Sequence, residues 1–113
     1  MKSVVSGAEI AVFGRAFIRA AEGLGLDDTE LSAVLQLRHG HERLQPGTEA
    51  WSQALLLVEL YQSLLAVVGN EQNARNWLSS ENTALISRPR DLIAFQTGLV
   101  QVVNYLAAAR SLI

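Results

Sequence analysis

Residues 49–68 read EAWSQALLLVELYQSLLAVV, and this stretch decides the fold. When it is laid on a helix, apolar residues occur on nearly every side, and only a narrow polar stripe is left, formed by Ser52, Glu59 and Ser63. Thr48 provides an N-cap before this stretch and Gly69 a C-cap after it. The pattern predicts a long helix that is the central element of a hydrophobic core.

The most apolar part of this stretch, Ala54 to Val68, is shorter than the ~20 residues that a membrane-spanning helix needs, and Glu59, Gln62 and Ser63 interrupt it. We therefore expect a buried helix and no membrane partner. Met1 to Gly7 has no apolar run of the kind that a signal peptide carries, and the chain has no cysteine. Both features favour a cytoplasmic protein.

Composition limits the protein to one compact domain. The chain has 113 residues, of which 50% are apolar, enough for one core and too few for two independent ones. Its net charge of −2 gives no global positive field for nucleic acid. Only two prolines occur, and β-branched residues are scattered among good helix formers, so we expect an all-α fold.

Toward the N-terminus, the sequence predicts two helices and a loop. Ala8 to Glu22 has an apolar face at three- and four-residue steps, and glycines follow it. Asp28 or Thr29 is expected to cap a short helix, Glu30 to Leu37. Arg38 to Gly47 then has the glycine, proline and charge content of a loop.

Toward the C-terminus, Glu71 to Leu78 is predicted to be a short helix that ends in a polar run. Pro89 suits the first turn of the next helix, which is expected to carry Leu92, Ile93 and Phe95. Thr97 is the predicted cap of a last helix, Gly98 to about Leu112. Apolar residues continue to the last position printed, so we expect another molecule to cover this helix.

Residues 73–110 resemble the toxin-binding domain of the Xre/MbcA/ParS antitoxins. The resemblance rests on a series of short motifs in a fixed order: Ala74 and Trp77-Leu78, Asn82 with Ala84-Leu85, Pro89 with Asp91-Leu92-Ile93, and Gly98 with Val102, Val103 and Leu106. Residues 41–47 and 55–61 also resemble the segment that joins this module to the N-terminal helices. We therefore expect a small single-domain helical bundle with a shortened helix-turn-helix-like part, residues 1–47, and a toxin-binding part, residues 48–113.

The resemblance implies that the protein is an antitoxin, not an enzyme, and that it needs no cofactor. Its implied partner is a RES-domain toxin, an NAD-consuming protein similar to ADP-ribosyl-transferases, whose active site the antitoxin's C-terminal helix would cover. Self-association into a homodimer is also expected. The predicted toxin-binding residues are Leu99, Val102, Val103, Tyr105, Leu106, Arg110, Leu112 and Ile113.

The apolar stripe of the last helix and the motif residues of the resemblance also have simpler structural explanations. The apolar stripe is equally consistent with packing on the central helix. Asn82 suits a turn, Asp91 suits the first turn of a helix, and Trp77 is expected inside the core.

Xre-type members of the family carry a DNA-binding helix-turn-helix, and here Thr29 to Leu37 resembles its first helix, but the chain that follows, to Arg43, leaves little room for a recognition helix. The basic residues that remain there, and that we expect to contact DNA weakly at most, are Arg38, His39, His41 and Arg43. The two histidines with Glu42 lack the further ligands of a metal site, so none is expected. The alternatives to an antitoxin are a DNA-binding transcriptional regulator that represses its own operon, and an orphan helical scaffold.

Overall fold

The computed structural model describes residues 6–35 and 45–112, and these form six helices and no strand. The all-α prediction is therefore confirmed. The helices, in chain order, are α1 (Gly7–Leu24), α2 (Asp28–Val34), α3 (Glu49–Val68), α4 (Glu71–Ser79), α5 (Pro89–Leu92) and α6 (Gln96–Arg110). Residues 36–44 contain Arg38, His39, His41 and Arg43, so the expected DNA contacts lie outside the described residues.

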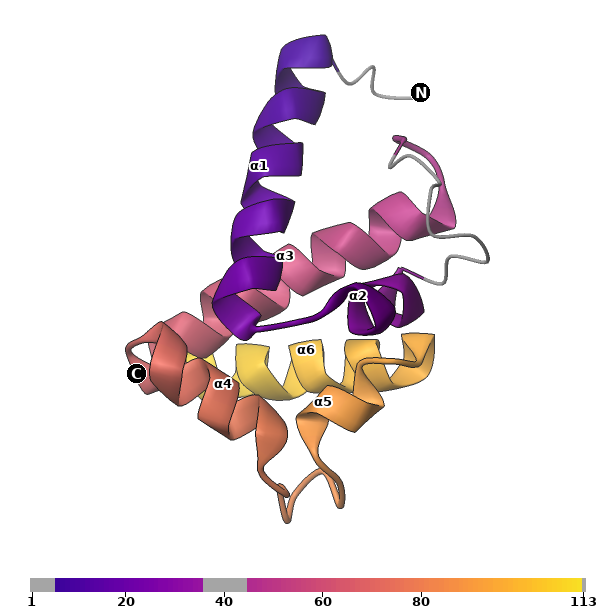
Figure 1. Cartoon of the computed structure of the whole chain (residues 1–113). Helices are drawn as coiled ribbons and strands as arrows, with labels where there is room; N and C mark the ends of the chain where they lie inside the picture. The colour runs from indigo at the N-terminus through magenta and orange to yellow at the C-terminus, as the bar shows by residue number, and fades with distance from the viewer. Residues whose placement is uncertain (1–5, 36–44, 113) are drawn as a thin grey trace.

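The central element is α3, as the sequence predicts. It packs most extensively against α6 on one side and α1 on another (Figure 1). Leu57, Leu60 and Leu64 are fully buried in it. Thr48 accepts a hydrogen bond from the backbone N–H of Trp51, and Gly69 ends the helix with φ 93°, so both predicted caps are confirmed.

The polar stripe predicted on the surface of α3 is wrong at Ser63. Ser63 is buried and so is Gln53, whereas Ser52 and Glu59 are exposed. By length and composition α3 is also able to cross a bilayer, a property that core helices of soluble proteins share. Here Leu57, Leu60 and Leu64 pack in the core with the other helices of the same chain, whereas Leu55 is exposed.

Two helix starts differ from the predicted ones. Asp27, rather than Asp28 or Thr29, caps α2, because its carboxylate accepts from the N–H of Glu30 while the Glu30 side chain accepts from the N–H of Asp27. Helix α6 begins at Gln96, and Phe95 occupies the cap position with no side-chain hydrogen bond. Thr97 thus lies inside the first turn and does not cap it.

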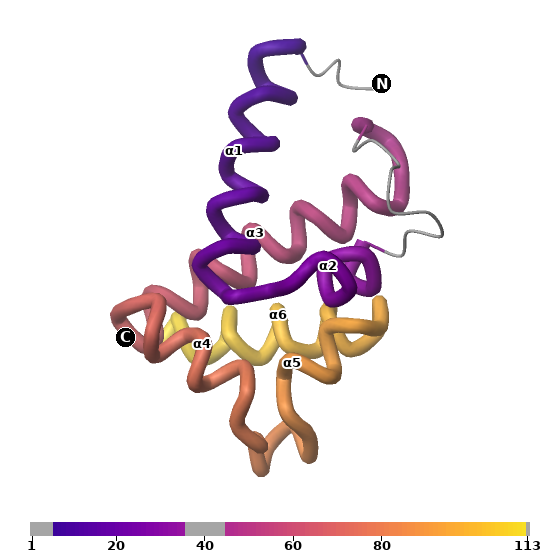
Figure 2. Tube along the Cα trace, viewed as in Figure 1, coloured from indigo at the N-terminus to yellow at the C-terminus, as the bar shows by residue number. Residues whose placement is uncertain are grey.

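The chain between α4 and α5 projects as a loop at one end of the molecule (Figure 2). Asn82 accepts hydrogen bonds through Oδ1 from the backbone N–H groups of Ala84 and Leu85, which confirms its prediction as a turn residue. Pro89 occupies the first turn of α5, also as predicted, but α5 ends at Leu92. Phe95 therefore lies beyond α5 and is exposed to solvent.

Candidate partner-binding surface

The inner face of α6 belongs to the core of the single chain. Leu99, Val102, Val103 and Leu106 are all buried there and form one cluster with α3 and α1. These four residues therefore pack on the central helix, which is the structural alternative given for them above. Contact between them and a partner stays a prediction, and it requires α6 to leave the core.

The outer face of α6 is different in composition. Its exposed residues up to Ala108, which we call the outer face, are Gln96, Thr97, Val100, Gln101, Asn104, Tyr105, Ala107 and Ala108. None of them carries a charge, and Arg110 is the only charged residue in the whole helix. Centres of protein interfaces are depleted of charged residues, and tyrosine is enriched there, so this face has the composition of a binding surface.

Tyr105 is held in place on the outer face by α4. Its ring stacks on that of Trp77, with centroids 6.2 Å apart and an angle of 21° between the planes. Trp77 is predicted inside the core; in the structure it is half-buried, packs against the core cluster and also stacks on Tyr105. An aromatic residue fixed in this way offers contact area to a partner with little loss of conformational entropy.

The end of α6 provides the remaining predicted site residues. Arg110 is exposed but donates a long hydrogen bond, 3.5 Å, from Nη1 to the hydroxyl of Ser63 in α3. Leu112 is 86% exposed, so the chain itself does not cover it. Ile113 lies outside the described residues. The structure thus leaves Tyr105, Arg110 and Leu112 accessible, while the four inner residues are not.

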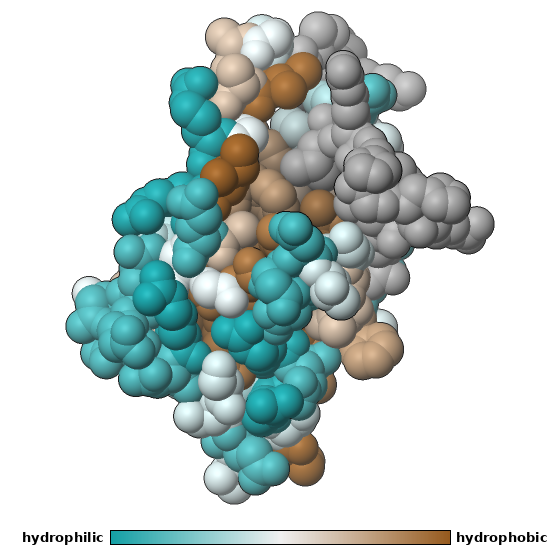
Figure 3. Space-filling view, viewed as in Figure 1, coloured by the Kyte–Doolittle hydropathy of each residue, from teal (hydrophilic) through white to brown (hydrophobic). Residues whose placement is uncertain are grey.

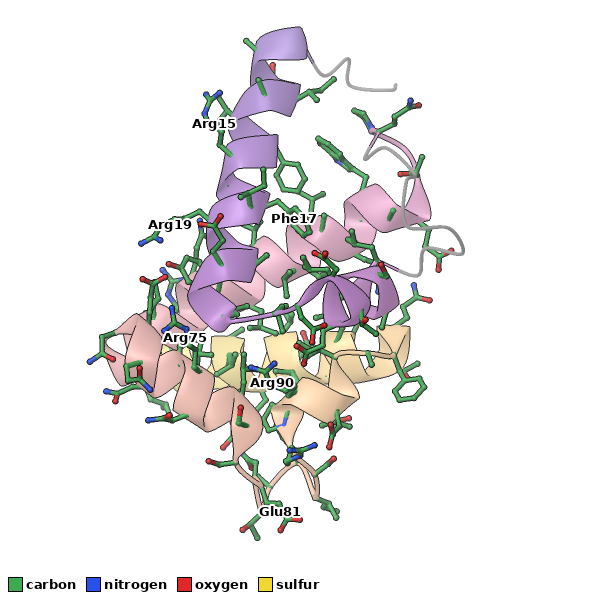
Figure 4. The ribbon with its side chains drawn as sticks, in the orientation of Figure 1. Arg15, Phe17, Arg19, Arg75, Glu81 and Arg90 are labelled. Atoms are coloured by element: carbon green, nitrogen blue, oxygen red, sulfur yellow. The ribbon has the colours of Figure 1, made fainter. Side chains whose placement is uncertain are left out.

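Arginines of α4 and α5 bind the C-terminal end of α1 (Figure 4). Arg75 donates from Nε to the carbonyl of Gly23, and Arg90 donates to the carbonyls of Leu24 and Gly25. Cations are favourable at this end of a helix, where carbonyl groups lack intrahelical partners. Arg90 also pairs with Glu30 of α2 at 2.6 Å.

A second polar contact holds α1 to α4. Glu71 accepts from Arg19 of α1 at 3.2 Å and from the hydroxyl of Tyr61 at 3.0 Å. Burial raises the pKa of Tyr61, and the hydrogen bond to Glu71 raises it further. Near the α4–α5 loop, Asp91 accepts two hydrogen bonds from Arg88, which raises the pKa of the guanidinium.

Two further features were not found from the sequence. A groove of about 380 Å³ lies between α2 and α5, with the Arg90–Glu30 pair in one wall and Phe95 at its edge. On α1, Ala8, Val12, Phe13 and Ala16 form a largely apolar patch that includes Glu9, and Phe13 also contacts Trp51 of α3. Hydrophobic residues line the side of α1 that faces the rest of the molecule (Figure 3). Sequence periodicity marks Phe13 as inward-facing but gives no signal for Val12.

Nothing in the described part of the chain resembles a metal centre, since no cluster of three or more His, Asp or Glu side chains occurs there. His39 and His41 lie in residues 36–44, outside the described residues.

The chain was compared with models of known protein families. Residues 63–111 match the model of the antitoxin Xre/MbcA/ParS C-terminal toxin-binding domain. The matched span begins in the second half of α3 and includes α4, α5 and α6, and it contains the residues 73–110 on which the sequence resemblance rests. No curated protein matches the chain.

Proposed function

We propose that the protein is an antitoxin that neutralises a RES-type, NAD-consuming toxin with its last helix, because residues 63–111 match the Xre/MbcA/ParS C-terminal toxin-binding domain. The match supports an antitoxin role and a toxin partner. The RES identity of the toxin, and the covering of its NAD site by the C-terminal end of α6, are parts of the proposal.

The observation that carries the proposal is the charge-free outer face of α6 within the matched domain. A solvated helix normally places charged residues opposite its apolar stripe, since they keep the exposed side hydrated. Here the exposed side offers amides, alanines, Val100 and a fixed tyrosine instead. Such a helix fits a groove of the partner, with Leu112 extending beyond its last turn.

A matched pair of substitutions tests the docking face. Gln101 lies on the outer face, and Gln62 is exposed on α3, so Gln101→Arg and Gln62→Arg make the same chemical change at two surface positions. We expect Gln101→Arg to weaken binding of the RES-domain protein encoded beside this chain by about tenfold or more, because a charge is buried in the complex. Gln62→Arg should leave binding unchanged. Equal affinities for the two variants would exclude the outer face.

NAD consumption tests neutralisation itself. Increasing amounts of this chain should abolish NAD loss by the RES-domain protein at a fixed stoichiometry. A chain that ends at Ala109 should bind more weakly and neutralise less, while its unfolding midpoint in urea changes little, because Arg110 and Leu112 are exposed. If the toxin still depletes NAD in the presence of excess full-length chain, the proposal is wrong.

Self-association is proposed at a separate place, the apolar patch on α1. Its residues lie on the first half of α1, which extends away from the other helices (Figure 1). Val12→Arg would place a charge in this patch. We expect the wild-type chain to be a dimer by light scattering and Val12→Arg to be a monomer that still binds the toxin. A monomeric wild-type protein would overturn this part.

A further inference from the structure

Ile86 combines two unfavourable properties. Among the residues that the structure describes, it is the one non-glycine residue with a positive φ, 60°. This region of conformational space is unfavourable for side chains branched at Cβ, and glycine or asparagine normally occupies it. Ile86 is also 90% exposed, the highest value among the large hydrophobic residues described. The free chain thus gains no burial from this side chain.

The loop that presents Ile86 is held rigidly by hydrogen bonds. The N–H of Ile86 donates to the carbonyl of Asn82 at 2.8 Å, and the N–H of Asn82 donates to the carbonyl of Ser87 at 3.0 Å. The neighbouring Leu85 is buried in the core and anchors the loop from within. The backbone thus presents Ile86 on the outside of the loop before any partner arrives, and less backbone entropy is lost on binding.

The surroundings of Ile86 define the kind of surface that it fits. The tip of the loop, where Figure 4 labels Glu81, is mostly hydrophilic, with a hydrophobic spot visible on it in Figure 3. Glu81, Thr83 and Ser87 surround Ile86 there and leave a shallow hollow. An apolar side chain ringed by hydrogen-bonding groups is the usual layout of an interface anchor.

We propose that Ile86 is a second anchor for the toxin, which inserts into an apolar recess with hydrogen-bond donors at its rim. This inference rests on the proposed antitoxin function. The loop lies inside the matched residues 63–111, between α4 and α5, and the toxin is the partner that this domain is built to bind. Backbone strain that gives the free chain no benefit is commonly kept where it serves a contact.

Two substitutions test the anchor, because they are expected to move stability and affinity in different directions. Ile86→Asn and Ile86→Gly both suit a positive φ, so the unfolding midpoint in urea should stay the same or rise. Both remove the apolar contact, so affinity for the neighbouring RES-domain protein, measured by titration calorimetry with a catalytically inactive toxin, should fall about tenfold or more. Ile18→Asn is the matched control, because Ile18 is exposed on α1 outside the matched domain.

Three results would overturn the anchor. Unchanged toxin affinity in both Ile86 variants would show that the loop does not touch the toxin, while leaving the antitoxin function intact. A loss of stability parallel to the loss of affinity would make Ile86 a structural residue. A change in oligomeric state with unchanged toxin affinity would assign the loop to a second copy of the chain. If the wild-type chain itself does not bind the toxin, the proposed function fails as well.

Discussion

The two faces of α6 have the same helix geometry but opposite chemical character. The inner face contributes Leu99, Val102, Val103 and Leu106 to the core, whereas the outer face is exposed and carries no charge. A solvated face needs polar groups but has no physical need to avoid charged ones. Burial in this chain accounts for the inner face, and the proposed contact with a toxin would account for the composition of the outer one.

The largest expected effect comes from the inner face. Leu106→Ala would leave a cavity beside α3, since Leu106 is fully buried, and should lower the free energy of unfolding by about 2–5 kcal/mol. Urea unfolding followed by circular dichroism measures this loss. Toxin affinity, corrected for the folded fraction, should stay near that of wild type. A stability loss below about 1 kcal/mol would remove the distinction between the faces.

A smaller loss is expected at the start of α6, where the helix meets α5. A methyl group on Gly98 would collide with the backbone carbonyl of Leu92, so Gly98→Ala should lower stability by about 1–3 kcal/mol. Gly14→Ala is the matched control, because a methyl group at Gly14 in α1 meets no neighbouring atom within 4 Å. There we expect a gain of up to about 1 kcal/mol from helix propensity. Equal effects of the two changes on thermal unfolding would contradict this.

On the outer face, a substitution of Tyr105 is expected to lower toxin affinity more than it lowers stability. Tyr105→Ala removes the stack on Trp77, so stability should fall by about 0.5–1.5 kcal/mol. Toxin affinity should fall further, by about tenfold or more, because both the contact area and the fixed position of the ring are lost. Tyr105→Phe keeps the stack and should retain stability. If Tyr105→Ala binds the toxin as tightly as wild type, the outer face is not the docking surface.

The smallest expected effect concerns Tyr61 of α3, and it is a change in how the stability of the fold depends on pH. The pKa of Tyr61 is raised above 10.0 in the folded chain, so its contribution to stability is present below about pH 10 and is lost as pH rises through the higher folded value. Tyr61→Phe should therefore unfold with a weaker dependence on pH in this alkaline range. Urea midpoints at about pH 9 and pH 11 test this. An identical pH dependence in the two proteins would show that Tyr61 titrates normally.

Local sequence patterns were sufficient for most of the fold. Helical periodicity identified α1, α3 and α4, and capping residues placed the ends of α3. The start of α6 was missed because Phe95 has no side-chain cap, and the true first bond, from the N–H of Leu99 to the carbonyl of Phe95, leaves no sequence signal. The contacts of Arg75 and Arg90 with α1 join residues far apart in the chain, so no local pattern reveals them.

The candidate site was predicted less well, for a related reason. An apolar stripe such as Leu99, Val102 and Leu106 has the same spacing whether it faces the chain's own core or a partner. The absence of charge on the opposite side was visible in the sequence and is the more informative signal. The conformation of Ile86 depends on the hydrogen bonds that Asn82 makes around it, which required the folded structure.

The arginines that bind the end of α1 also determine how this protein can be divided. The matched span starts at residue 63, near the C-terminal end of α3, and an excised fragment from that point would lack the carbonyl groups of residues 23–25 that Arg75 and Arg90 bind. It would also lack most of α3, including Leu57 and Leu60. We therefore expect that the matched segment does not fold on its own here, so transplanting it onto another carrier would require α1 and all of α3 to move with it.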